Sequence, residues 1–222
     1  MMRVLEIVEA KVVRRLEQVR VIALAEFEDG EQAETAGASL VAAGCACVEI
    51  QSWQLGVLRA ARRVEGLMVG AGNLRSPEDA EAAARAGVHF ATATATNTEI
   101  VHACRELELP FFPGVTTPTE IERLALLGVR VMRVFPATPL GGPAYLQAVA
   151  ESYPELRFIP SGGIGPEQVR SYLRTQSVIA VGVGGLVGKD LLRSHSYGRI
   201  EWLAHEAVRG AEPRLRPVAA QP

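Results

Sequence analysis

The chain alternates strand-like and helix-like segments eight times, and this regularity limits its possible folds more than any other feature. Short apolar runs predict buried strands, and each is followed by a longer segment with helical spacing. Eight such units in 222 residues predict an α/β fold, a single (β/α)8 TIM barrel over residues 1–210 with a loose tail over residues 211–222. An open doubly wound sheet is the alternative. The predicted strands cover residues 19–25, 45–50, 67–72, 88–91, 110–115, 131–135, 157–160 and 178–182.

Helix start and stop signals follow these strands, and one further helix is predicted in front of the first strand, over residues 2–18. Ser76 and Thr117 are typical N-caps, because each precedes a proline and an acidic residue, and Ser52 is a third candidate. The helices that begin after Ser76 and Thr117 end near glycines. The other predicted helices cover residues 30–43, 53–64, 97–108, 143–152, 166–174 and 197–210.

Composition excludes several classes of function. A net charge of −2 and an aromatic content of 5% give no reason to expect nucleic acid or an anionic membrane as partner. Residues 1–20 contain no long apolar run, so neither a signal nor a membrane segment is expected there. Cys45, Cys47 and Cys104 favour buried free thiols in a reducing cytoplasm. The scattered histidines form no ligand cluster, so we expect neither a metal nor another cofactor.

Arg133 is the most informative single residue, because it lies inside an apolar run that predicts a buried strand. A guanidinium is not buried without a polar cavity or a carboxylate partner. Glu49, inside the apolar run Cys-Val-Glu-Ile, is the natural partner. In a barrel, functional side chains gather at the carboxyl ends of strands. Glu49 could therefore act as a general base beside Arg133, or the two residues could form a structural ion pair; the sequence leaves both open.

Two glycine-rich stretches follow the last two predicted strands. Backbone amides without side chains in the way can cradle a phosphate, and barrels commonly bind one at this position. The alternative is that these glycines only allow tight turns. The candidate binding residues at strand ends and in these turns are Asn73, Thr94, Pro113, Phe135, Ser161, Gly162, Gly163, Gly182 and Gly184.

Several stretches, taken together and in order, resemble one enzyme family. They are Val48-Glu-Ile, Gly70-Ala-Gly, Phe112-Pro-Gly-Val-Thr-Thr-Pro-Thr-Glu, Phe135-Pro-Ala and Pro160-Ser-Gly-Gly-Ile. From about residue 15 to residue 210 the chain resembles the 2-keto-3-deoxy-6-phosphogluconate / 4-hydroxy-2-oxoglutarate aldolases. The resemblance implies a homotrimer of (β/α)8 barrels and a class I lyase that splits a 2-oxo acid into pyruvate and an aldehyde.

The chain departs from this family where the family's chemistry takes place. The position of the family's Schiff-base lysine holds Arg133, which cannot act as an amine nucleophile. The resemblance makes Glu49 the retained general acid/base. The family's substrate-binding arginine is Trp53 here, its threonine after the third strand is Asn73, and its last phosphate-binding serine is Gly184.

These observations predict an aldolase-family scaffold that binds a 2-oxo acid or a phosphorylated small molecule such as a sugar phosphate, with the class I cleavage lost or altered. A non-catalytic phosphate-binding or regulatory protein is the alternative. A retained aldolase that uses another lysine is the third hypothesis. The chain has only Lys11 and Lys189, and the sequence places Lys189 several residues beyond the last strand.

Overall fold

The computed structural model describes residues 4–51 and 54–212. Its parallel strands form a six-stranded sheet in the order β5-β4-β3-β2-β1-β9 and a three-stranded sheet in the order β6-β7-β8. The strands are β1 Val21–Ala25, β2 Cys47–Ile50, β3 Met68–Ala71, β4 Phe90–Thr92, β5 Phe111–Phe112, β6 Gly114–Val115, β7 Val131–Val134, β8 Arg157–Pro160 and β9 Val181–Val187.

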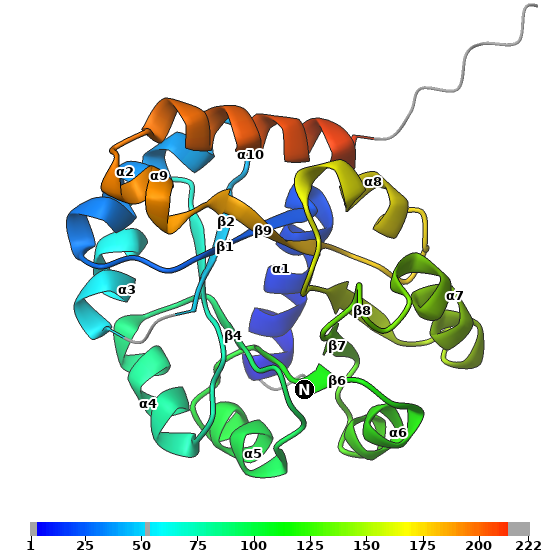
Figure 1. The fold of residues 1–222 in the computed structure, drawn as a ribbon. Helices are drawn as coiled ribbons and strands as arrows, with labels where there is room; N and C mark the ends of the chain where they lie inside the picture. Colours follow the sequence, from blue (N-terminus) through cyan, green and yellow to red (C-terminus); the bar gives the residue numbers. More distant parts are fainter. Residues whose placement is uncertain (1–3, 52–53, 213–222) are drawn as a thin grey trace, which may run out of the picture.

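The two sheets meet on both sides. β5 and β6 are separated only by Pro113, whose missing N–H interrupts the ladder. On the other side, isolated bridges join Phe158 to Val178 and Ser161 to Gly182. The strands thus surround a common interior, and the helices after α1 form an outer ring (Figure 1). This arrangement confirms the predicted α/β fold of the TIM-barrel type.

The helices alternate with the strands as the sequence predicts, although the last part of the chain differs. The helices are α1 Val4–Val19, α2 Gly30–Ala42, α3 Leu55–Arg62, α4 Pro77–Ala86, α5 Thr98–Glu106, α6 Pro118–Leu126, α7 Gly142–Ser152, the 3-10 turn η1 Pro166–Gln168, α8 Val169–Tyr172, α9 Lys189–Arg193 and α10 Tyr197–Ala211. Within the described residues, no helix is both long enough and apolar enough to cross a membrane.

Two of the three predicted N-caps are confirmed. The Ser76 hydroxyl accepts a hydrogen bond from the Asp79 N–H at 3.4 Å. Thr117 and Glu120 form a reciprocal capping box at the start of α6. Ser52 lies outside the described residues, and the N-cap of α3 is Gln54. Local capping chemistry therefore fixes where α4 and α6 begin.

The end of the chain corrects three expectations. The eighth strand extends to Val187 rather than residue 182, the short helix α9 follows it, and the helix expected over residues 166–174 is η1 followed by one turn of α8. β9 continues past Gly184 and Gly185 because its register against β1 shifts there: Ala23 pairs with Val183, and Ala25 pairs with Val187. Helix α10 ends at Ala211, and residues 213–222, which make up most of the expected tail, lie outside the described part.

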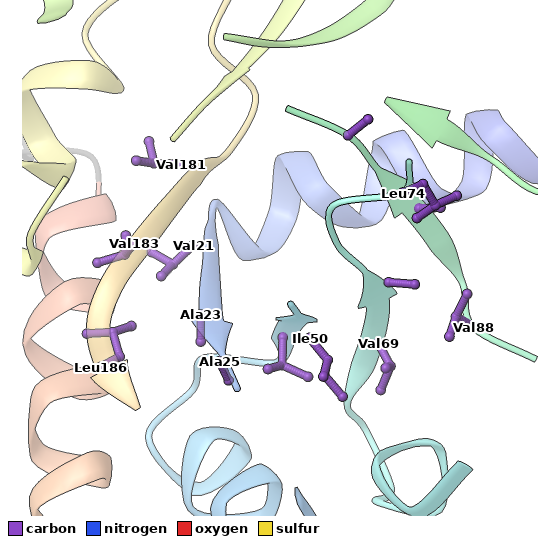
Figure 2. Close-up of a cluster of buried hydrophobic side chains, with 14 of the residues drawn as sticks. Val21, Ala23, Ala25, Ile50, Val69, Leu74, Val88, Val181, Val183 and Leu186 are labelled. Atoms are coloured by element: carbon purple, nitrogen blue, oxygen red, sulfur yellow. The ribbon is translucent and has the colours of Figure 1, made fainter. Parts of the chain in front are cut away.

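Side chains of the strands point alternately inward and outward, and this alternation produces two apolar clusters. The outer cluster packs strands against helices; Figure 2 shows Val21 and Ala23 of β1 beside Val181 and Val183 of β9. The inner cluster contains Ile22 of β1 and the first residues of several other strands, and Val12 and Leu16 of α1 pack against them. Helix α1 therefore covers the amino-terminal end of the barrel and leaves the carboxyl ends for the site.

Gly70→Ala is expected to destabilise the barrel by about 1–3 kcal/mol, because the interior has no room for the added methyl group. A Cβ on Gly70, in β3, would lie 2.8 Å or less from three ring atoms of the fully buried Phe90. The control is Gly56→Ala in α3, where a Cβ meets no heavy atom within 4 Å. That change should stabilise the protein by about 0.5–1 kcal/mol. Equal effects in urea unfolding would contradict the close packing of Phe90.

Candidate functional site

A cavity of about 330 Å3 opens at the carboxyl ends of the strands. A larger one, about 870 Å3, is lined by residues of α7, α8 and the segments beside them, and contains none of the predicted site residues. Position in the barrel therefore favours the smaller cavity as the functional site. It is lined by Leu24, Ala25, Glu26, Gln51, Asn73, Thr94, Arg133, Phe135, Val187 and Lys189.

Arg133 projects from β7 into the barrel interior, where its side chain is only 2% exposed. Its Nη1 donates to Glu49 Oε1 and, at 2.7 Å, to Thr92 Oγ1. Its Nε donates to Ser161 Oγ at 2.6 Å. The Phe135 ring centroid lies 5.7 Å from Cζ, within range of a cation–π contact. The predicted pairing of Arg133 with Glu49 is thus confirmed. Residues of β2 and β4, together with the residue that follows β8, hold the guanidinium in place.

Glu49 and two amide side chains extend this arrangement across β2 and β3. Glu49 Oε1 also accepts from Gln51 Nε2 at 2.5 Å, and Gln51 Oε1 accepts from Asn73 Nδ2. A Cβ on Gly72 would lie 2.6 Å from Glu49 Oε1, so only glycine leaves room for this chain of contacts. An unbroken chain of hydrogen bonds therefore runs from Arg133 through Glu49 and Gln51 to Asn73.

Asn73 is unusual in its backbone and in its side chain. Its φ of 59° lies in the left-handed region, which asparagine tolerates better than most residues. Its buried Oδ1 has no hydrogen-bond partner within the described residues. Because Asn73 lines the cavity, a ligand or solvent donor could complete its hydrogen bonding. The wall of the cavity thus contains an unpaired buried acceptor at Asn73 and a cation at Arg133.

A second ion pair lies at the cavity mouth. Lys189 Nζ is 2.6 Å from Glu26 Oε2, and both residues line the cavity. The sequence placed Lys189 several residues beyond the last strand; in fact β9 ends at Val187 and α9 begins at Lys189. The Lys189 side chain is 64% exposed, so this pair is solvated, unlike the buried pair behind it.

The two glycine stretches lie next to each other. Gly162 and Gly163 have φ angles of 93° and 76°, which favour glycine, and the Gly184 N–H donates to Ile164 O at 3.1 Å. The second stretch is not a turn after the strand, as expected, but part of β9, and Gly182 is buried against Ser161. The stretches share a region beside the site, although the cavity lining contains neither of them.

The structure divides the predicted site residues into three groups. Four line the cavity, two lie behind it in contact with Arg133, and five lie outside its lining. The residues that line the cavity are Asn73, Thr94, Arg133 and Phe135. The two behind it are Glu49 and Ser161. Those outside its lining are Pro113, Gly162, Gly163, Gly182 and Gly184. Trp53, at the position of the family's substrate-binding arginine, lies outside the described residues.

Sequence reasoning missed Gln51 and Glu26. Gln51 follows Glu49 by two residues, so the two side chains share a face of the strand, and that spacing was the available signal. Glu26 directly follows β1, as a residue at a strand's carboxyl end should. Within the described residues, no group of three His, Cys, Asp or Glu side chains is placed to hold a metal ion.

Comparisons with known proteins agree on one family. The sequence model of the family described as "Aldolase: KDPG and KHG aldolase" matches residues 12–203. The "KHG/KDPG aldolase" of Escherichia coli (strain K12) is 34% identical over 186 residues, which cover 82% of this chain and 87% of the relative. The "2-dehydro-3-deoxy-phosphogluconate aldolase" of Dickeya dadantii (strain 3937) is 38% identical over 151 residues, or 68% of this chain and 71% of the relative.

A solved structure gives the same result for the fold. The 2-keto-3-deoxy-6-phosphogluconate aldolase of Zymomonas mobilis ZM4, crystallised with 3-phosphoglycerate, superposes with a TM-score of 0.80. It is 25% identical in sequence, and the match covers 88% of this chain and 94% of that chain.

Proposed function

The chain belongs to the KDPG and KHG aldolase family, and from that premise we propose that it is a divergent member acting on a 2-oxo acid without an imine. In this proposal Arg133 binds the substrate and Glu49 moves a proton at the carbon next to the ketone. The observation that carries it is Arg133, which lines the cavity while contacting Glu49, Thr92 and Ser161.

Arg133 supports non-covalent chemistry. A guanidinium stays protonated and delocalised, so it offers donors rather than a nucleophilic electron pair. No described residue accepts a hydrogen bond from its Nη2, and Nη2 is therefore the nitrogen left for a ligand. Such a fixed, water-shielded cation binds a carboxylate or stabilises an enolate oxygen more strongly than a solvated one.

Glu49 supplies the proton acceptor. Arg133 and Gln51 both donate to Oε1, and Oε2 accepts from no described side chain. In the proposed step, Oε2 removes a proton from C3 of the 2-oxo acid. The C–H electron pair forms a C2=C3 double bond, and the π pair of the carbonyl moves onto the ketone oxygen. Arg133 stabilises the resulting enolate, and return of a proton restores the substrate. No covalent bond between substrate and protein forms in this step.

The glycine stretches support binding of a phosphorylated substrate. The positive φ angles of Gly162 and Gly163 hold two amides without side chains in the way, and Gly184 lies against the same loop. The Zymomonas mobilis relative was crystallised with 3-phosphoglycerate, which shows that a family member accepts a phosphate ester. The proposal therefore places a phosphate group beside these glycines.

Two further properties belong to the proposal on family grounds, a homotrimer and a cytoplasmic location. Burial raises the pKa of the Cys45 and Cys104 thiols to about 12. Such thiols are inert, and this suits a protein that needs no disulfide.

Proton exchange tests the proposed step. Wild-type protein in D2O should exchange the C3 protons of pyruvate or 2-oxobutanoate, which proton NMR follows directly. Glu49→Gln should slow this exchange by about 10²- to 10⁴-fold, because the amide cannot accept the proton. Glu206→Gln, which removes a surface carboxylate paired with Arg209 on α10, is the control and should leave the rate unchanged.

The outcomes separate the competing functions. Absence of exchange across 2-oxo acids and sugar phosphates, combined with thermal stabilisation by a phosphate ester, would reject catalysis and favour the binding or regulatory protein. A borohydride-trapped pyruvate adduct on Lys189 would favour the third hypothesis, an imine formed by the lysine at the cavity mouth, and would remove the role assigned to Arg133.

A further inference from the structure

A third cavity, of about 570 Å3, lies at the opposite, amino-terminal end of the barrel. Its rim carries Lys11 and Arg15 from α1, and Arg62 and Arg63 from the end of α3. Val12, Leu67 and Met68 line its apolar part. Residues of the inner apolar cluster, including Phe90 and Phe112, lie between this end of the barrel and the carboxyl ends of the strands. The cavity is thus distinct from the site around Arg133.

His89, which also lines this cavity, is fixed by its neighbours. Its main-chain N–H donates to Val69 O at 2.8 Å, and the Val69 N–H donates back to the ring Nδ1 at 2.9 Å. A main-chain N–H can only donate, so Nδ1 must be the accepting nitrogen. In a neutral imidazole the proton then resides on Nε2. Burial, and secondarily the charge of Arg62, lowers the pKa of His89, in keeping with a neutral ring.

This tautomer leaves two donors facing each other. Arg62 Nη1 lies 3.0 Å from His89 Nε2, and neither nitrogen can accept. Arg62 cannot easily turn away, because its Nε donates to Gly87 O at 2.6 Å. Two N–H groups that converge without an acceptor need one, and an oxygen shared between them would satisfy both. Arg62 and His89 therefore offer two converging donors to one oxygen ligand.

The charges around Arg62 and His89 indicate which chemical group would supply this oxygen. Arg63 is neutralised by Glu34 at 2.5 Å. Within the described residues, no carboxylate lies within 4.0 Å of a charged nitrogen of Lys11, Arg15 or Arg62. Glu65 is the single acidic residue in the lining, so three cations face one anion. A phosphate monoester, whose charge is about −1.5 to −2 at pH 7, matches this surplus better than a monocarboxylate.

We propose that this cavity is a second ligand site that binds a small phosphate monoester with an apolar body. The phosphate oxygens accept from Arg62 Nη1 and His89 Nε2–H and face Lys11 and Arg15, while the organic part contacts Val12 and Met68. The site is independent of the proposed chemistry at Arg133, because none of its residues lines the other cavity.

Calorimetric titration with phenyl phosphate and with inorganic phosphate tests the site. Lys11→Gln/Arg15→Gln should weaken phenyl phosphate binding about tenfold or more, as expected for the loss of two charges. Both residues are exposed on α1, so this variant should fold normally. Arg199→Gln, which removes an exposed cation stacked on Trp202 of α10, is the matched control and should bind like wild type. Equal affinities in the double variant and in wild type would overturn the proposal, whatever phosphate does at the opposite end.

Nitrogen NMR of the imidazole tests the geometry directly. The His89 resonances, assigned by their loss in His89→Gln, should show the Nε2–H tautomer and should shift when phenyl phosphate is added. An Nδ1–H tautomer, or resonances unmoved at saturating ligand, would overturn the site. Inorganic phosphate should bind more weakly than phenyl phosphate; equal affinities would overturn the assignment of an ester with an apolar body.

Discussion

Replacing Glu49 by alanine is expected to lower the free energy of unfolding by about 3–5 kcal/mol, because Arg133 would keep its charge in the barrel without a carboxylate. Both side chains are only 2% exposed. The hydroxyls of Thr92 and Ser161 would still accept hydrogen bonds from the guanidinium, but they cannot neutralise it. Urea or guanidinium unfolding followed by circular dichroism measures the loss.

Two further variants isolate the buried charge as the cause. Glu34→Ala breaks the exposed pair with Arg63 and should cost no more than about 1 kcal/mol. The double change Glu49→Leu/Arg133→Met replaces the buried pair by apolar groups and should recover most of the lost stability. If Glu49→Ala cost as little as Glu34→Ala, water entering through the cavity would have to be solvating Arg133.

Arg133→Lys is expected to create the amine nucleophile that wild type lacks at this position. The introduced lysine would lie in the barrel interior near Glu49, Thr92 and Ser161. Burial there favours its neutral, reactive form, and the Glu49 carboxylate opposes this by favouring the charged form. Pyruvate and borohydride should then leave a stable adduct at residue 133, which mass spectrometry of peptides locates. A gain of ten-thousand-fold in cleavage of a 4-hydroxy-2-oxo acid would correspond to about 5.5 kcal/mol of barrier.

The controls for this gain follow from the scarcity of lysine in the chain. Wild type has only Lys11 and Lys189, so every adduct can be assigned. Arg133→Gln, which is polar but carries no amine, should remain unlabelled. An unlabelled Arg133→Lys protein that still folds would show that the surrounding residues no longer support an imine.

Much of the site could be predicted because a buried charged or polar group needs a partner, and such groups are visible in the sequence. A charge inside an apolar strand needs a partner, and only Glu49 stood in a comparable position, so the pairing with Arg133 followed from physical chemistry alone. The N-caps at Ser76 and Thr117 were predictable for a similar reason, since their hydrogen bonds are local.

Long-range register, by contrast, could not be predicted from local pattern. The Gly184-Gly185 pair is compatible with a turn and with an irregular strand. Only the pairing with β1 shows that β9 continues to Val187. That extension brings Lys189 to the cavity mouth opposite Glu26. The contact of Gln51 with Asn73 likewise depends on how β2 and β3 align, which residue spacing alone does not fix.

The unpartnered amide oxygen of Asn73 bears on selectivity. A cavity with an unfilled acceptor favours molecules that bring a hydroxyl to that point and penalises otherwise identical molecules that bring a hydrogen. Leaving one buried polar atom unsatisfied costs about 1–3 kcal/mol, which corresponds to roughly 5- to 150-fold in affinity. Under the proposed function, this single atom would therefore favour a hydroxylated 2-oxo acid over its deoxy analogue, although it takes no part in moving the proton.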